Sequence, residues 1–217
     1  MCTVSWIHTP TGYHLLCNRD EQNTRRPALP PVIHEASGAR FIAPVDGDHN
    51  GSWIAVNEFG ITLCLVNRYR CFHCSSERNT KPPSRGLLLS RLAVCRSLEE
   101  AQSRFETLDL AAYPPFTVVV LAPGRPSLLL HWTGRDSLIE CNGEAAIPLV
   151  SSSFDARGVE VCRKRLFNTL AAERGRVDLQ LLLDFHASHA PTPSAYSPCM
   201  HRENALTVSF SRVTVRD

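Results

Sequence analysis

The chain has 217 residues, of which 43% are hydrophobic and 20% are charged, and its formal net charge is +2 at pH 7. This length and composition are typical of a globular protein with a sizeable core, so we expect residues 1–217 to form a single domain. The small net charge and the absence of a Lys/Arg-rich block argue against nucleic acid or an anionic membrane surface as the main partner.

The sequence carries no signal for a membrane or for secretion. No apolar run approaches the ~18 residues that a membrane span needs, and the first residues lack the basic region of a signal peptide. The nine cysteines are odd in number and lie in apolar stretches, which suits a reducing compartment better than a disulfide scaffold. We therefore expect a cytoplasmic protein without a transmembrane segment.

The first third of the chain contains short apolar runs separated by turn residues, which predicts two β-hairpins. The first hairpin is expected over residues 3–18, with its turn at 9–12. The second is expected over residues 52–66, with its turn at 57–60. The segment between them, residues 25–50, is rich in proline and is expected to be irregular.

Helical spacing of apolar residues predicts one helix over residues 84–108, or two helices joined near residues 95–97. Ser84 is the expected cap of its start, and Ser97 and Glu100 are spaced like a capping box. Further helices are predicted over residues 159–173 and 177–189. Strands are predicted at residues 116–122, 127–132, 137–141, 147–151, 205–210 and 212–215.

The order of these elements favours antiparallel sheets, because consecutive strands are joined by short turns. Several strands, such as FTVVVLA and ITLCLV, are apolar on both faces, so both sides of each sheet should be covered. The predicted fold class is therefore α+β, a four-layer αββα sandwich of two antiparallel sheets flanked by helices. A single sheet with helices on one face is the simpler alternative, but it leaves one face of these strands in water.

Cys2 is a candidate nucleophile because of its place in the chain. If the start methionine is removed, Cys2 carries a free α-amine with a pKa of about 7.7–8.0. One residue then supplies both a nucleophile and a base near neutral pH. With Met1 retained, the Cys2 nitrogen is an ordinary amide, and the thiol is one more small buried residue.

Five segments together resemble the NRDE family, which includes the transport and Golgi organisation protein 2 homologues: MCTVSW, CNRDEQNTRRPALP, GSWIAVNEFGITLCLVN, SRGLLLSRLAVCRSLEEAQ and CMHRENALTVSFSRV. The family is named after the run found here at residues 18–21. The resemblance covers nearly the whole chain and implies a fold of the N-terminal nucleophile hydrolase type. More distantly, the first third is similar to the cysteine branch of those hydrolases, the penicillin V acylase and bile-salt hydrolase group.

The resemblance implies roles for individual residues. It makes Cys2 the nucleophile, Asp20 the carboxylate that holds the α-amine, with Arg19 beside it, and Asn67 the oxyanion donor. An amide aimed at a developing oxyanion is worth about 2.7–4 kcal/mol in comparable acyl-transfer sites. The residues expected to contact substrate are Asn18, Asn57, Ser152 and Arg202.

The chain also departs from the hydrolase pattern. Those enzymes carry an arginine three residues before the aspartate, where this chain has Cys17. Here Arg19 directly precedes Asp20, and strand alternation sends adjacent side chains to opposite faces unless the strand ends or bulges. Serine replaces a later asparagine near Phe154. A second arginine has three candidates, Arg163, Arg165 and Arg202.

The pair Cys71 and Cys74 forms a lone CxxC motif, which is weak evidence for a zinc site. Two further ligands would be needed, and the clustered supply is His186, His189, Cys199 and His201. His186 and His189 could face a metal or haem from one side of a helix, although a polar helix end is the more common reason for such a pair. We therefore expect no metal.

Two functions remain open at this point. The first is a hydrolase or acyltransferase that acts on an unidentified amide or ester and needs no cofactor. The second is a binding module on the same fold that handles haem or a lipid, as the resemblance to this family implies. In both cases the partner is a small molecule, and the sequence leaves its identity and the oligomeric state open.

Overall fold

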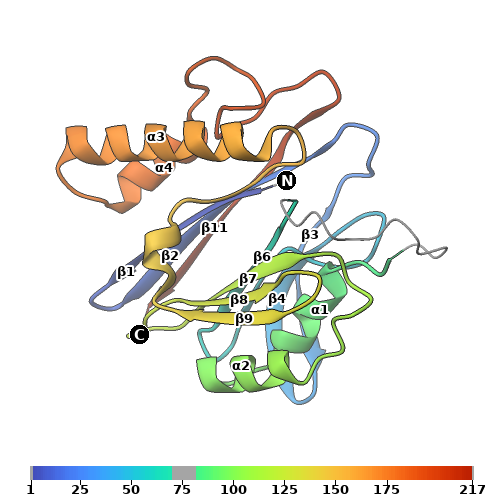
Figure 1. The fold of residues 1–217 in the computed structure, drawn as a ribbon. Coiled ribbons are helices and arrows are strands. Elements are labelled where there is room, and N and C mark those ends of the chain that lie inside the picture. The colour runs from blue at the N-terminus through green and yellow to red at the C-terminus, as the bar shows by residue number, and fades with distance from the viewer. Residues whose placement is uncertain (1, 70–81, 217) are drawn as a thin grey trace. The chain divides into compact units, whose positions relative to one another are not determined.

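The computed structural model describes residues 2–69 and 82–216 and contains two antiparallel sheets and four α-helices within those ranges (Figure 1). Internal contacts divide the chain into two units, one formed by Met1–Arg25 with Ala145–Asp217 and the other by Arg26–Glu144. Each unit has its own sheet and its own pair of α-helices. The CxxC motif at Cys71 and Cys74 lies outside the described residues.

The first unit contains a four-stranded sheet in the order β10-β1-β2-β11, with α3 and α4 on one of its faces (Figure 1). Leu16 of the sheet packs with Phe167, Leu181 and Phe185 of the two helices, so apolar burial holds the layers together. The elements are β1 (Cys2–Thr9), β2 (Gly12–Gln22), β10 (Leu149–Ser151), α3 (Ala156–Arg174), α4 (Leu179–Ala187) and β11 (Ala205–Arg216).

The helices of this unit begin at acidic caps. Asp155 accepts a hydrogen bond from the Gly158 amide at the start of α3, and Asp178 accepts one from Leu181 at the start of α4. The two closing strands predicted over residues 205–215 are in fact one continuous strand, β11. It pairs with all of β2, with one register shift between Thr207 and Ser209.

The second unit is a seven-stranded antiparallel sheet in which every strand pairs with its neighbours in sequence, in the order β3 to β9. Every residue of β7 is buried, as its apolar sequence predicts. The helices α1 and α2 pack against strands β5 to β8. The elements are β3 (Leu29–Ala36), β4 (Ala39–Val45), β5 (Ile54–Asn57), β6 (Thr62–Asn67), α1 (Gly86–Leu92), α2 (Leu98–Glu106), β7 (Phe116–Leu121), β8 (Leu128–Trp132), β9 (Ser137–Cys141) and the 3-10 helix η1 (Gly143–Ala146).

The prediction of an irregular segment at residues 25–50 is wrong, because this segment forms the hairpin of β3 and β4. Two of its four prolines, Pro30 and Pro31, lie in the edge strand of the sheet, where a missing N–H costs little. The turn uses positive φ angles of 50° at Ser37 and 70° at Gly38. Strand signals in β3 are weak because its residues are almost all exposed.

The region 84–108 forms two helices, as one of the two predicted alternatives requires. Ser97 caps α2 by accepting a hydrogen bond from the Glu100 amide at 3.1 Å. The expected cap at Ser84 is wrong, since α1 begins after Arg85 and no side chain caps it. Among residues 2–69 and 82–216, no helix has the length and apolar character that crossing a bilayer requires.

Candidate functional site

Cys2 lies in a row of four side chains that crosses the sheet of the first unit. Cys2 pairs with Ser151 on one side and with Arg19 on the other, and Arg19 pairs with Ser209. Directly opposed residues of antiparallel strands share a face, so these side chains form one polar row. The hydroxyls of Ser151 and Ser209 are buried, and neither has a hydrogen-bond partner among the described residues. The row therefore contains a thiol, a cation and two hydroxyls with unused hydrogen-bonding capacity.

The residues next to this row point to the opposite face, which α3 and α4 cover. Both terminal nitrogens of Arg163, on α3, lie 3.4 Å from Asp20 Oδ2, and the guanidinium also donates to Thr3 Oγ1. Thr207 Oγ1 donates to the other Asp20 oxygen at 2.6 Å. The side chains of Asp20 and Arg163 are 0% and 1% exposed. Asp20 and Arg163 are thus a buried ion pair with further hydrogen bonds.

The strand β2 neither ends nor bulges at Arg19 and Asp20, the two possibilities that the sequence left open. The β1–β2 register runs without a shift through Arg19, so Arg19 and Asp20 point to opposite faces. A shift occurs instead on β11, between Thr207 and Ser209. Arg19 lies opposite Cys2 and its guanidinium donates to Glu21 at 3.2 Å. That Arg19 and Asp20 both act on Cys2 remains a prediction.

The Cys2 thiol is neutral in this environment. A hydrogen bond with the Cys17 side chain and burial together raise the pKa of Cys2 well above its ordinary value, and the charge of Asp20 adds to the effect. Cys17 is the diagonal neighbour of Cys2 across the strand pair, within reach of its side chain. It occupies the place where the resembled hydrolases carry arginine, whose charge would lower the pKa of the thiol.

A second buried network lies under α4. His186 Nε2 and Ser5 Oγ are 2.8 Å apart, and Asn18 Nδ2 donates to the His186 carbonyl at 2.8 Å and to the Pro198 carbonyl at 2.9 Å. Asn18, predicted to bind substrate, thus ties the end of α4 to the following loop. Burial, and then the charge of Arg163, lowers the pKa of His186 to about 3. His186 is therefore neutral in the folded protein at physiological pH.

The buried His186 is expected to make stability depend on pH. Its folded-state pKa of about 3 lies below the ordinary 6.5, so between these values the unfolded chain binds the extra proton and stability falls as pH falls. From pH 7 to pH 5 the loss due to this residue is about 2 kcal/mol. Urea unfolding of the wild type and of His186→Gln at both pH values measures it. Equal losses in the two proteins would contradict this assignment.

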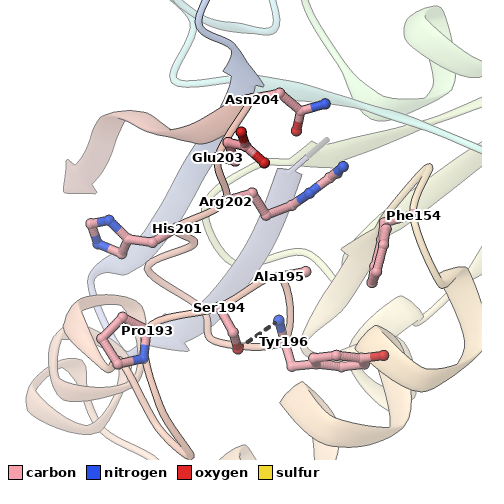
Figure 2. Close-up of a pocket in the computed structure, with 9 residues that line it drawn as sticks. All are labelled: Phe154, Pro193, Ser194, Ala195, Tyr196, His201, Arg202, Glu203 and Asn204. Carbon is pink, nitrogen blue, oxygen red and sulfur yellow. Dashed lines mark hydrogen bonds between the residues drawn. The ribbon is translucent and has the colours of Figure 1, made fainter.

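A pocket of about 880 Å³ opens beside the start of α3 and the loop after α4 (Figure 2). Arg202, predicted to bind substrate, lies in its wall with the guanidinium carbon 4.7 Å from the centre of the Phe154 ring. The buried Ser152 accepts a hydrogen bond from the Phe154 amide at 3.2 Å and so fixes the turn that carries this ring. The pocket is lined by Phe154, Pro193, Ser194, Ala195, Tyr196, His201, Arg202, Glu203 and Asn204.

Asn57, also predicted to bind substrate, belongs to the second unit and has its side chain fully engaged. Its nitrogen donates to the carbonyls of Ala93 at 3.0 Å and Cys95 at 2.7 Å. Its oxygen accepts from the amides of Phe59 and Ile61, both at 3.0 Å. These four bonds form the turn between β5 and β6 and tie it to the end of α1, so Asn57 has a structural role.

Asn67, the predicted oxyanion donor, is the last residue of β6 in the second unit. Its amide nitrogen donates to the Tyr69 hydroxyl at 2.9 Å, and its side chain is partly exposed. It therefore keeps a polar group available at a strand end. Its role toward Cys2 remains a prediction that rests on the resemblance.

The three arginines that the sequence left as candidates for a second arginine differ in their surroundings. Arg163 is the buried partner of Asp20, whereas Arg165 is exposed and Arg202 lines the pocket. Sequence reasoning missed Thr207 and Ser209, which reach Asp20 and Arg19 only because β11 pairs with β2. Simple alternation along ALTVSFSRV gives Thr207 and Ser209 the same face, whereas the register shift between them sets Thr207 opposite Asp20 and Ser209 opposite Arg19.

Among the described residues, one group of three potential metal ligands occurs, formed by His189, Cys199 and His201. The two histidine side chains are exposed and the cysteine is half-buried. The other histidine of this region, His186, is buried and faces Ser5 instead. The four residues that the sequence offered as extra ligands for the CxxC motif thus separate into a buried network and a surface group.

Comparison with known proteins identifies the family and the fold. The family described as Transport and Golgi organisation 2 matches residues 1–174. Among solved structures, an N-acylethanolamine-hydrolyzing acid amidase ortholog from Caenorhabditis elegans is similar, with a TM-score of 0.61 and 13% identity over 88% of this chain and 87% of that chain. A search of curated proteins gave no match.

Two variants of the conjugated bile acid hydrolase from Clostridium perfringens are also similar. One gives a TM-score of 0.55 at 11% identity, over 97% of this chain and 85% of that chain, and the other gives 0.53 at 12%, over 95% and 84%. At 11–13% sequence identity these similarities show the fold alone, which is that of the N-terminal nucleophile hydrolases. The predicted family, fold type and α+β class are therefore confirmed.

Proposed function

The chain belongs to the Transport and Golgi organisation 2 family, and from this premise we propose that it is a hydrolase or acyltransferase whose Cys2 thiol attacks a small amide or ester. The observation that carries the proposal is the place of Cys2 as the first residue of an inner strand. It lies in one polar row with Arg19 and two buried hydroxyls that have no hydrogen-bond partner in the part of the chain that the structure describes. The hydrolase-type fold supports it.

The proposed reaction has two steps. Cys2 Sγ attacks the carbonyl carbon while the α-amine of Cys2 takes the thiol proton, and the amine then gives this proton to the departing amine or alcohol. Water, or a second nucleophile in an acyl transfer, then cleaves the thioester and restores the thiol. The raised pKa of Cys2 fits a thiol that loses its proton only as it attacks. The scheme requires that Cys2 be the first residue of the mature chain.

The remaining residues have supporting roles in this proposal. The ion pair of Asp20 and Arg163 fixes the end of β2 and the charge next to Cys2. Arg19 and the Ser151 hydroxyl lie on either side of Cys2 and can contact the substrate's polar groups. The role of Asn67 as oxyanion donor stays a prediction from the resemblance, and the proposal does not depend on it. Arg202 in the pocket can pair with an anionic group.

A second function, non-catalytic binding of haem or a lipid, is supported by one observation. The hydrogen bond with Cys17 and burial raise the pKa of Cys2, which lowers the fraction of reactive thiolate at neutral pH. A thiol with a raised pKa is what this fold would carry if Cys2 had no catalytic role. In that case the ligand binds equally well when Cys2 is replaced.

The two functions are separated by intact mass and by turnover on the same purified sample. The hydrolase requires a mass without Met1 and turnover of p-nitrophenyl esters or N-acyl amides that scales with enzyme concentration. A retained Met1 removes the α-amine and contradicts the proposed mechanism. Absence of turnover over a broad acyl panel, together with haem or lipid binding that survives Cys2→Ala, supports the binding module.

Replacing Cys17 with alanine is expected to make Cys2 more reactive. The substitution removes the hydrogen bond that contributes most to the raised pKa of Cys2, so the thiolate fraction at neutral pH rises about tenfold for each unit by which the pKa falls. The rate of iodoacetamide labelling at Cys2, followed by peptide mass, measures it. An unchanged rate in a folded Cys17→Ala protein would show that Cys17 does not control this thiol.

A further inference from the structure

Three metal-binding side chains meet on the surface after α4. His189 Nε2 and His201 Nε2 are 3.0 Å apart, and Cys199 Sγ lies 3.9 Å from His201 Nε2. All three ligand atoms lie within 4.8 Å of one another. The two imidazole rings lie with their centres 4.9 Å apart and their planes tilted by 31°. We propose that His189, Cys199 and His201 form a binding site for a single Zn²⁺ ion.

The distances match what a tetrahedral zinc ion requires. With Zn–N of about 2.0–2.1 Å and Zn–S of about 2.3 Å, two nitrogens lie about 3.3 Å apart and nitrogen and sulfur about 3.6 Å apart. The observed 3.0 and 3.9 Å differ from these values by a few tenths of an ångström. The third separation, between the ligand atoms of His189 and Cys199, is at most 4.8 Å, and binding one ion requires it to be about 3.6 Å.

The backbone holds the ligands in place before any ion binds. The Cys199 amide donates to the Ser188 carbonyl at 3.0 Å, which ties the cysteine to the residue next to His189. The His201 amide donates to the Ser194 carbonyl at 3.1 Å, and His201 also forms a bridge with Leu206 at the start of β11. A preorganised set of ligands loses little conformational freedom on binding, which favours affinity.

The chemistry of the three ligands favours zinc over harder cations. Imidazole and thiolate suit borderline and soft metals, whereas Mg²⁺ and Ca²⁺ prefer oxygen. Cysteine binds zinc as its thiolate, so a zinc ion that binds Cys199 displaces the thiol proton. Two histidines and one cysteine leave the fourth position of a tetrahedral ion open, as in catalytic zinc sites.

The proposed zinc site shares one residue, His201, with the lining of the pocket. His201 and Arg202 are adjacent in sequence, and both line the pocket, yet their side chains leave the loop in different directions (Figure 2). An ion held at His201 would therefore lie beside the pocket wall. The zinc site does not depend on the proposed role of Cys2.

The test is zinc titration by calorimetry on the full chain carrying Cys71→Ser and Cys74→Ser, which removes the CxxC motif as a competing site. We expect one Zn²⁺ per chain. His189→Ala, Cys199→Ser and His201→Ala should each lower the zinc affinity by more than about 100-fold, because loss of a residue that only supports a ligand costs at most about that much. His49→Ala, at a histidine outside the group, is the matched control and should bind as before.

Cobalt supplies an independent readout of the same ligands. Co²⁺ bound to the same protein should show a thiolate-to-metal charge-transfer band in the near ultraviolet, and Cys199→Ser should abolish the band. Circular dichroism checks that each variant is folded. Absence of stoichiometric zinc binding would overturn the proposal, as would unchanged affinity in folded His189→Ala and His201→Ala proteins. In that case the short distance between His189 and His201 would reflect only a hydrogen bond between their rings.

Discussion

Cys2→Ala should lower turnover of any amide or ester substrate by at least about 1000-fold, because loss of the nucleophile of a covalent hydrolase costs on the order of 10⁶ in kcat. The side chain is small and lies at the end of a strand, so the fold should survive the change. Steady-state kinetics with the best substrate of an acyl panel gives the measurement, and thermal unfolding confirms that the variant is folded.

Two further variants make this result specific to Cys2. Cys141→Ala, at an exposed thiol on β9, is the matched control and should retain full activity. Cys2→Ser keeps an oxygen nucleophile and should retain a small residual rate. Turnover by Cys2→Ala at the wild-type level would mean that the activity belongs to another site or that the chain is a binding module.

Arg163→Met should destabilise the protein by about 3–5 kcal/mol, because it leaves the Asp20 carboxylate charged and buried without its cation. Both side chains are at most 1% exposed, so solvent does not screen the loss. The substitution also removes the hydrogen bond to Thr3 that ties α3 to β1. Urea unfolding at pH 7 measures the change in the free energy of unfolding.

The neighbouring Arg165 supplies the control, since it lies on the same helix and is exposed. Arg165→Met should change the free energy of unfolding by no more than about 0.5 kcal/mol. The double variant Asp20→Leu with Arg163→Met should recover part of the stability lost in Arg163→Met, because no unpaired charge stays buried. A loss below about 1 kcal/mol in Arg163→Met would mean that water reaches Asp20 and the pair is not buried.

Secondary structure was predicted best where it depends on apolar spacing and turn residues within a short stretch of sequence. The hairpin of β1 and β2, the two helices joined near Cys95 and the fully apolar β7 all follow from patterns within a few residues. The hairpin of β3 and β4 was missed because its outer strand is exposed and contains two prolines. An edge strand tolerates both features, and its pairing is decided by the rest of the sheet.

The candidate site was predictable in its residue types but not in its pairings. Alternation alone implied that Arg19 and Asp20 diverge, and the structure has them on opposite faces of β2. The sequence did not show that Arg163 is buried beside Asp20, because this contact depends on how α3 packs on the sheet. The row of Ser151, Cys2 and Ser209 joins residues more than 50 positions apart, so only strand order reveals it.

The most direct test of the central claim is a search for an acyl group on Cys2. The protein is mixed with a p-nitrophenyl ester of a medium-chain fatty acid, quenched in acid during turnover, digested and analysed by peptide mass. We expect an acylated N-terminal peptide that begins at Cys2, and no such adduct in Cys2→Ala. An N-terminal peptide that retains Met1, or an acyl group that persists in Cys2→Ala, would contradict the proposed role of Cys2.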